Sequence, residues 1–323
     1  MLSRVAENIY WMARYLERAE GGARMMATSS QMLFDLPRET PLSWGTMVDI
    51  LGAGEKFAEL EFEPTERDVT QFLLKETRFP NSLASVVRQA RENARVCRDI
   101  LPGELWEGIN DLHYFVGETL PRVRSRSARY DFLQQVISRC QQVEGIVHGT
   151  LSRNTLYSFM MLGQALERAD MTSRIVDVRS ANLLPKDAAD IYSSLGWMSV
   201  LQSLSAYEMY RHEVQVRIRG QAVVQFLLRG TRFPRSCHFC LSCVETSLTQ
   251  LPRAEKPLRR LREIIDRLER EHLQADNLDS VHRFVDLFQQ ELGTLHEAIT
   301  DSYFRFDRND WVHASRAAAT QQA

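Results

Sequence analysis

Residues 72–82 read FLLKETRFPNS, and residues 226–236 read FLLRGTRFPRS. Eight of these eleven positions are identical, at an offset of 154 residues. A shared helix-breaking composition would explain a common proline, but it does not explain a common TRFP inside FLL-x-x-TRFP-x-S. The match therefore indicates an internal repeat with a period of about 150 residues.

Two further matches support the repeat, and they occur in the same order along the chain. Residues 16–20 read LERAE and residues 166–170 read LERAD, at an offset of 150. Trp44 and Trp197 lie between the other two matches, at an offset of 153. Three collinear matches with a slowly drifting offset are expected of a duplication with small insertions.

Helical periodicity is the main local pattern in both copies. Near the N-terminus, Ile9, Met12 and Leu16 recur at spacings of three and four, which places them on one helix face. Strand-like alternation is scarce, and its best example, residues 214–218, is an isolated run that we assign to a helix or a linker. The sequence therefore predicts an all-α fold of about ten helices in two duplicated bundles related by a pseudo-twofold axis.

We expect the two bundles to pack as one unit. The halves are residues 1–150 and 151–307, and the chain between them has the composition of a short turn, with Ser152 or Asn154 as the next helix N-cap. Residues 1–307 are therefore predicted to form a single domain. The tail, residues 308–323, ends in alanines and glutamines and is predicted to be flexible.

Composition and charge argue against several classes of protein. The 323 residues include 40 Lys and Arg against 42 Asp and Glu, and 44% of them are hydrophobic, which is typical of globular proteins. The near-neutral balance argues against a nucleic-acid partner, and no apolar run approaches the ~20 residues that span a membrane. We find no secretory signal at the start and no disulfide pattern in the five cysteines. We therefore expect a cytoplasmic protein.

The repeated acidic and basic residues can be interpreted in two ways. Each LERA segment is followed by an arginine that lies four residues after its second acid, the favourable order for an ion pair within a helix. In a structural role, the charged pairs would tie helices together across the pseudo-dyad. In a functional role, they would line a cleft in which arginines bind carboxylate or phosphate oxygens. The residues of this candidate cleft are Glu17, Arg18, Arg24, Glu167, Arg168 and Arg174. We favour the structural role.

The two TRFP turns provide secondary candidates. Arg78 and Ser82 in the first copy, and Arg232 and Ser236 in the second, lie where a helix is expected to begin. Free backbone N–H groups at such a position can bind an anion, but each serine can equally serve as an ordinary N-cap. We favour the ordinary cap.

Metal, cofactor and nucleotide motifs are not evident. Cys237, Cys240 and Cys243 follow one another at spacings of three, but no second CxxC or distant HxxxH completes a zinc site. Glu144 and His148 lack the partners of a di-metal bundle site. The sequence has no phosphate-binding glycine motif, no GxSxG and no HExxH. We therefore expect no metal and no cofactor, and the sequence leaves open whether the protein is an enzyme.

Longer motifs carry a family resemblance. Residues 7–24 read ENIYWMARYLERAEGGAR, residues 166–178 read LERADMTSRIVDV, and residues 197–211 read WMSVLQSLSAYEMYR. From Leu2 to about Phe306, the chain resembles the bacterial alpha-E family, a helical domain named for a Glu-Arg motif. The resemblance transfers that motif onto Glu17-Arg18 and Glu167-Arg168, without a catalytic role.

The resemblance also implies partners. Alpha-E proteins accompany a circularly permuted ATP-grasp protein, and often a transglutaminase-like protease, in systems thought to form peptide bonds or peptide tags with ATP. The leading hypothesis is therefore an accessory protein that helps bind or present the acceptor. A second hypothesis is a transferase or ligase subunit that uses the Glu-Arg cleft, and a third is a purely structural homodimer scaffold. Reachable glutamates in one shared pocket would favour the second hypothesis, and sealed ion pairs would favour the third.

Overall fold

A computed structural model describes residues 3–35, 43–182, 190–214, 217–271 and 278–305. Over these residues the protein forms fourteen α-helices and no strand. In chain order the helices are α1 (Ser3–Asp35), α2 (Gly45–Ile50), α3 (Gly54–Glu59), α4 (Glu66–Lys75), α5 (Leu83–Cys97), α6 (Gly103–Thr119), α7 (Arg126–Thr150), α8 (Thr155–Asn182), α9 (Asp190–Ser203), α10 (Tyr207–Val214), α11 (Gly220–Arg229), α12 (Cys237–Thr249), α13 (Glu255–Arg270) and α14 (Leu278–Tyr303). The predicted flexible tail, residues 308–323, lies outside the described residues.

The all-α class is confirmed, but the predicted number of about ten helices is wrong. Helices α2 and α3 have six residues each, and α10 has eight. So short a helix completes about two turns and shows too few apolar repeats to be recognised by its period. The strand-like run 214–218 begins at the end of α10, continues through residues 215–216, which lie outside the described residues, and is not helical at Arg217 and Ile218.

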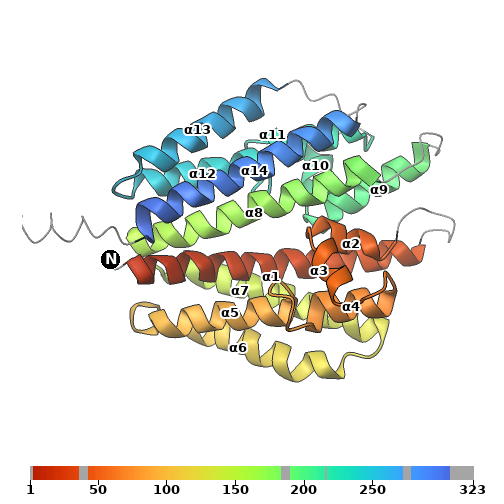
Figure 1. The fold of residues 1–323 in the computed structure, drawn as a ribbon, viewed down its shortest axis with the longest axis horizontal. Helices are drawn as coiled ribbons and strands as arrows, with labels where there is room; N and C mark the ends of the chain where they lie inside the picture. Colours follow the sequence, from red (N-terminus) through yellow and green to blue (C-terminus); the bar gives the residue numbers. More distant parts are fainter. Residues whose placement is uncertain (1–2, 36–42, 183–189, 215–216, 272–277, 306–323) are drawn as a thin grey trace, which may run out of the picture.

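Helices α1 and α8 lie side by side at the centre of the molecule (Figure 1). Helix α1 packs against α5 and α7, and α6 covers these two on the outside. Helix α8 packs against α12 and α14, and α13 covers these two in the same way. The molecule thus has two layers, one of α1, α5, α6 and α7 and one of α8, α12, α13 and α14, and the helices of each layer follow the same order along the chain. The α1–α8 contact is the main junction between the two layers.

The α1–α8 contact requires a residue without a side chain. A Cβ atom on Gly163 of α8 would lie 2.3 Å from the carbonyl oxygen of Tyr10 of α1. Glycine therefore lets the two backbones approach more closely than any other residue would. At the start of α8, Asn154 accepts the amide N–H groups of Leu156 and Tyr157 at 3.0 and 3.4 Å, as expected for a helix N-cap.

The repeated TRFP segments form matching turns. In the first copy, Phe79 stacks on Phe72 of α4 with ring centroids 4.3 Å apart, and Ser82 accepts the amide N–H of Ser85 as the N-cap of α5. In the second copy, Phe233 stacks on Phe226 of α11 at 5.1 Å, and Ser236 caps α12 through the amide of Phe239. The shared residues therefore form the same aromatic contact and the same helix cap in both turns.

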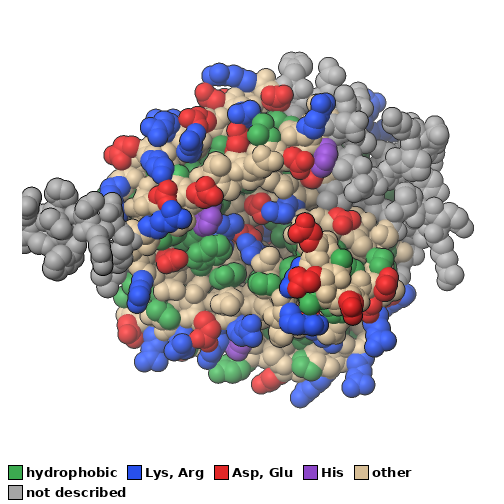
Figure 2. Space-filling model, in the orientation of Figure 1, with side chains coloured by type: hydrophobic (Ala, Val, Ile, Leu, Met, Phe, Trp, Pro, Cys, Tyr) green, Lys and Arg blue, Asp and Glu red, His purple; other side chains and the backbone are tan. Residues whose placement is uncertain are grey.

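One continuous hydrophobic core spans both layers, and it includes Ile9 and Met12 of α1 as well as Leu162 and Leu166 of α8. On the face drawn in Figure 2, basic and acidic side chains are interspersed, as the balanced composition predicts. Among the described residues, no helix combines the length and the apolar character that crossing a membrane would require.

Candidate functional site

The two Glu-Arg motifs pair with each other across the α1–α8 contact. Arg168 of α8 donates from Nε and Nη2 to the two carboxylate oxygens of Glu17 of α1, at 2.8 and 2.7 Å. Arg18 of α1 donates in the same way to Glu167 of α8, at 2.5 and 3.0 Å. Two parallel N–H···O bonds between a guanidinium and a carboxylate form a strong and directional ion pair. The acid of each motif therefore binds the base of the other.

Both glutamates are sealed from solvent. Glu17 is 3% exposed and Glu167 is 1% exposed. Burial raises the pKa of each carboxyl group, but the arginines outweigh it: Arg168 and Arg235 lower the pKa of Glu17 to about 2, and Arg14 and Arg18 do the same for Glu167. Both side chains therefore stay ionised and paired at neutral pH.

Glu167 belongs to a network that continues to α14. Arg14 donates from Nε to Glu167 at 2.7 Å and from Nη1 to the hydroxyl of Tyr10 at 3.2 Å. The Tyr10 hydroxyl in turn lies 2.9 Å from Nδ1 of His296. Burial, with a further contribution from Arg14, lowers the pKa of His296 to about 4, so its imidazole is neutral at pH 7. Because the guanidinium of Arg14 also lies 5.0 Å from the ring centroid of Trp11, it is held by charge and by aromatic contact.

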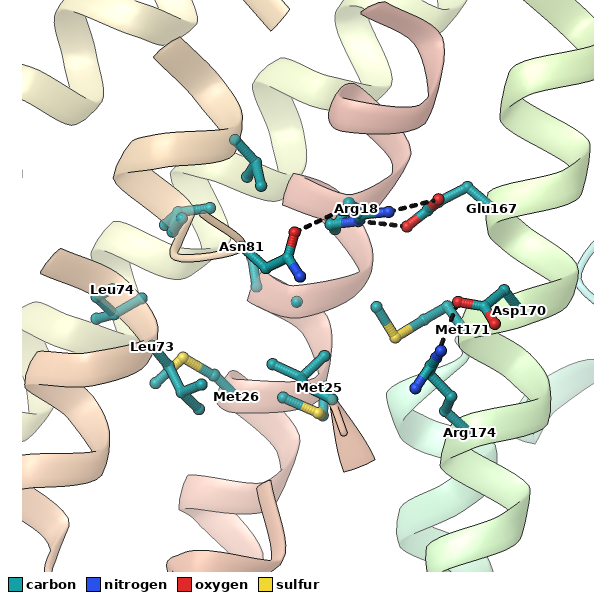
Figure 3. A pocket seen from close by; sticks show the side chains of 15 residues that line it. Arg18, Met25, Met26, Leu73, Leu74, Asn81, Glu167, Asp170, Met171 and Arg174 are labelled. Atoms are coloured by element: carbon teal, nitrogen blue, oxygen red, sulfur yellow. Dashed lines mark hydrogen bonds and ion pairs between the residues drawn. The ribbon is translucent and has the colours of Figure 1, made fainter. Parts of the chain in front are cut away.

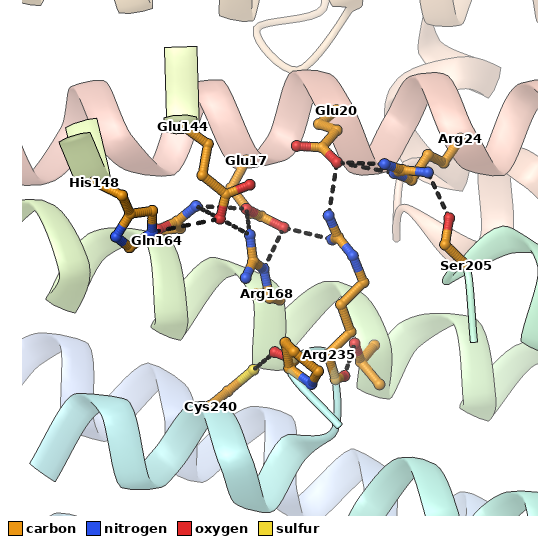
Figure 4. A network of polar contacts seen from close by, with 12 residues as sticks. Glu17, Glu20, Arg24, Glu144, His148, Gln164, Arg168, Ser205, Arg235 and Cys240 are labelled. Atoms are coloured by element: carbon orange, nitrogen blue, oxygen red, sulfur yellow. Dashed lines mark hydrogen bonds and ion pairs between the residues drawn. The ribbon is translucent and has the colours of Figure 1, made fainter. Parts of the chain in front are cut away.

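Glu17 belongs to a second network, drawn in Figure 4. Arg235, from the TRFPRS turn, donates to Glu17 at 2.8 Å and to Glu20 at 2.6 Å. Arg168 also donates to Glu144 of α7 at 3.0 Å. Arg235 therefore connects the turn before α12 directly to two successive acidic positions on α1.

The remaining sequence candidates lie around these networks. Arg24 pairs with Glu20 at 2.8 Å and Arg174 pairs with Asp170 at 2.8 Å, each within its own helix as the spacing predicted. Arg78 pairs with Glu76 and is largely exposed, and Arg232 is exposed. Ser82 and Ser236 are the N-caps described above. The structure therefore brings Glu17, Arg18, Glu167 and Arg168 together and leaves Arg78 and Arg232 apart from them.

Sequence reasoning did not select Arg14, Arg235 or Glu144 as site residues. Arg14 lies one turn before Arg18 on the same helix, so helical spacing could have identified it. Arg235 occupies the position of the repeat where the first copy has Asn81. This difference between two otherwise matching segments was the feature of the sequence that could have identified Arg235.

Three pockets lie beside the networks. The first, of about 80 Å³, lies between α1, α4, α5 and α8 and is lined by Arg18, Glu167 and Arg174 among others (Figure 3). The second, of about 470 Å³, lies between α7, α8 and α12 and is lined by Arg168 and His148 among others. The third, of about 30 Å³, is lined by Glu17, Glu20 and Glu144 among others. Glu17 and Glu167 therefore line different pockets and do not face one shared cleft.

The cysteines of α12 behave as small apolar residues. Cys237 and Cys240 are fully buried, and burial raises the pKa of the Cys240 thiol to about 12 and that of Cys237 well above its usual range. Their sulfur atoms contact the carbonyl oxygens of Ala169 and Pro234. Thiols in this state are poor metal ligands and poor nucleophiles, because both roles need the thiolate.

One grouping of possible metal ligands occurs in the described part of the chain. Oxygen and nitrogen atoms of Asp177, His282 and Asp286 lie within 4.8 Å of one another. Nδ1 of His282 lies 2.6 Å from Asp177, and Nε2 lies 3.5 Å from Asp286. The Nδ1 contact links α14 to α8, and the Nε2 contact lies within α14. Both ring nitrogens are therefore already in contact with a carboxylate, and Asp177 is too far from the other two residues in sequence to form a motif with them.

The fold and the site define an all-α protein in which two Glu-Arg motifs bind each other across a central helix pair. The chain belongs to the Alpha-E family: the family's model, described as a predicted alpha-helical domain with a conserved ER motif, matches residues 1–304. The resemblance seen in the sequence is thereby confirmed. Comparisons with curated proteins and with solved structures give no match.

Proposed function

We propose that this protein is a helical accessory subunit of an ATP-grasp peptide (amide) ligase system. In this role it helps to bind or present the acceptor during ATP-dependent synthesis of a peptide or peptide tag in the cytoplasm. Its main partner is a circularly permuted ATP-grasp protein, and a transglutaminase-like protease is a second partner. The family resemblance supports both partners.

The mutual saturation of the two Glu-Arg motifs is the observation that supports an accessory role. A general base must reach its substrate and have a pKa near the working pH. Glu17 and Glu167 are sealed, doubly bonded to arginines, and have pKa values lowered to about 2. They are suited to hold α1 and α8 in a fixed arrangement, so the activation of a carboxyl group by ATP is assigned to the partner.

We also propose that the two halves of the chain arose by duplication and are related by a pseudo-twofold axis. Helices α1, α5, α6 and α7 pack in the same order as α8, α12, α13 and α14. The reciprocal pairs Glu17–Arg168 and Glu167–Arg18 also support an approximate twofold relation. Such a relation gives the subunit two similar sides. Differences in sequence between the two halves can then adapt one side to bind the acceptor.

Reconstitution tests the proposed function. The full chain would be mixed with the circularly permuted ATP-grasp protein, and complex formation would be followed by size-exclusion chromatography with light scattering. ADP release would then be measured with a panel of amino acids and peptides. We expect a complex and a release of ADP that needs both the acceptor and this protein.

The same experiment distinguishes the other hypotheses. If neither a complex nor a change in ADP release is found, the accessory role is wrong. A homodimer that forms without the partner and does not affect it would support a structural scaffold. A transfer reaction by this protein alone, lost in Glu17→Gln and Glu167→Gln variants that remain folded, would support an enzyme.

A further inference from the structure

The first pocket lies beside a position at which the two copies of the repeat differ. In the second copy, Arg235 extends from the turn before α12 to Glu17 and Glu20 of α1. The equivalent residue of the first copy is Asn81, whose short side chain accepts a hydrogen bond from Arg18 at 2.5 Å. A pocket of about 80 Å³ remains beside it.

The walls of this pocket are apolar and its polar groups lie on opposite sides. Met25 and Met26 of α1, Leu73 and Leu74 of α4, and Met171 of α8 line it. Figure 3 shows the Asn81 amide at one side and the Arg174 guanidinium at the other, with the Met171 side chain between them. A small ligand in this space would meet both polar groups and the apolar wall.

The guanidinium of Arg174 has N–H groups that could bind a ligand. Among the described residues its hydrogen bond is the one from Nε to Asp170 at 2.8 Å, so neither Nη group is used there. The turn between α2 and α3 lies against the guanidinium, since a Cβ on Gly52 would lie 3.1 Å from Nη1 of Arg174. Burial opposes the charge of Arg174, but Asp170 outweighs it and raises the pKa. Arg174 is therefore a positioned cation with unused N–H groups.

The ion-pair network beside the pocket carries more positive than negative charge. Arg18 and Arg174 line the pocket together with Glu167 and Asp170. Arg14, which lies outside the lining, shares Glu167 with Arg18, so three arginines are paired with two carboxylates. The second network has as many arginines as carboxylates, namely Arg24, Arg168 and Arg235 against Glu17, Glu20 and Glu144. The network next to the pocket thus has one arginine more than carboxylates, and guanidinium groups bind carboxylates well.

We propose that this pocket binds a carboxylate with a short apolar tail, such as the α-carboxylate end of a small apolar amino acid. Arg174 binds the carboxylate oxygens, and the methionines and leucines contact the apolar side chain. The α-amino group is then left free, as an acceptor for peptide-bond formation requires. That last step rests on the proposed function, whereas the binding itself does not.

Calorimetry on the full chain tests the binding without any partner. The probes are L-leucine, 4-methylpentanoate, which lacks the amino group, and L-leucinamide, which lacks the carboxylate, at concentrations up to about 10 mM. We expect L-leucine and 4-methylpentanoate to bind and L-leucinamide to bind at least about tenfold more weakly, because it cannot pair with Arg174. Binding of L-leucinamide equal to that of L-leucine, or no binding of any probe, would overturn the proposal.

Two variants with a matched control locate the site. Gly22 of α1 lines the pocket, and a Cβ placed there would meet nothing within 4 Å. Gly22→Leu therefore fills the pocket without backbone strain, and it should abolish binding, while Gly22→Ala should retain it. Arg174→Gln should weaken L-leucine binding about tenfold or more. Circular dichroism checks that each variant is folded.

The outcomes separate this inference from the proposed function. If Gly22→Leu is folded and binds L-leucine like the wild type, the pocket is not the site. If the partner forms a complex and responds to an acceptor that the pocket does not bind, the proposed function stands and this inference fails. If L-leucine binds at the pocket but the ATP-grasp protein neither associates nor responds, this inference stands and the proposed function fails.

Discussion

Glu17 does not pair with Arg18, its neighbour in sequence, but with Arg168, which lies 151 residues further along the chain. Arg18 correspondingly pairs with Glu167. The glutamate of each Glu-Arg motif therefore forms its ion pair with the arginine of the other motif, across the α1–α8 contact. Removing one partner would leave the other charged and buried, which is far more destabilising than losing an exposed ion pair.

Double-mutant cycles should detect this exchange of partners. Glu17→Gln and Arg168→Gln should each lower the free energy of unfolding by ~3–5 kcal/mol, since each leaves an uncompensated buried charge. The double variant should lose less than the sum, with a coupling of ~0.5–3 kcal/mol. Urea unfolding of the wild type and the three variants gives these values.

The control cycle pairs Glu17→Gln with Arg18→Gln. These two side chains share no partner among the contacts described above, so their coupling should be clearly smaller. An exposed pair, Arg260 and Glu263, provides the second control, and Glu263→Gln should change stability by about 0.5 kcal/mol or less. A coupling between Glu17 and Arg18 larger than that between Glu17 and Arg168 would contradict the observed pairing.

Glu167 should make stability depend on pH in the acid range. Its folded pKa is lowered from 4.5 to about 2, so its stabilisation is fully present above pH 4.5 and is lost as the pH falls towards 2. The Glu167→Gln variant lacks this carboxylate at every pH. The gap in unfolding free energy between wild type and variant should therefore be large at pH 7 and should shrink below pH 4.5, as measured by urea unfolding at fixed pH values. A gap independent of pH would show that Glu167 is not held as a paired anion.

His296 should produce a second, separate pH window. Its folded pKa is lowered from 6.5 to about 4, so the unfolded chain takes up a proton before the folded protein does. Stability should then fall as the pH drops from 6.5 to 4. His296→Gln, which can still bond to the Tyr10 hydroxyl, should flatten the stability profile in this window while leaving the change below pH 4.5 in place.

Local features of the fold and site could be predicted from the sequence. The period of the apolar residues gave the helices, and the i, i+4 spacing gave the pairs Glu20–Arg24 and Asp170–Arg174. Ser82 and Ser236 could be assigned as caps because a cap depends on the three residues that follow it. In each case the interacting groups lie within two turns of one another.

The partners of Glu17 and Glu167 could not be predicted, because they depend on how α1 and α8 cross. The position of that crossing is set by Gly163 against the Tyr10 carbonyl, which no local pattern indicates. The same holds for Tyr10 and His296, which meet across 286 positions of sequence. The repeat revealed which residues correspond, but not which residues touch.

The close approach at Gly163 gives a further test of the α1–α8 contact. Gly163→Ala improves helix propensity by up to ~1 kcal/mol, but its Cβ would collide with the Tyr10 carbonyl, and such overpacking costs about 1–3 kcal/mol. We expect net destabilisation in urea. Gly145→Ala in α7, where a Cβ would meet nothing within 4 Å, should be neutral or stabilising. Equal effects of the two changes would argue against the crossing described here.

The cysteines of α12 provide a measure of how firmly the second half is packed. Burial raises the thiol pKa of all three cysteines, but Cys243 is only partly buried, whereas Cys237 and Cys240 are sealed. With a thiol reagent such as iodoacetamide at pH 8, Cys243 should be modified first. Cys237 and Cys240 should react only when the helix opens, because the reagent needs an accessible thiolate.

Peptide mass spectrometry over time identifies the order of modification. The slow modification of Cys237 and Cys240 should accelerate in Arg235→Gln, which removes the bridge from the turn before α12 to Glu17 and Glu20. Modification of Cys237 or Cys240 before Cys243 would mean that α12 is not packed against α8 as the structure describes.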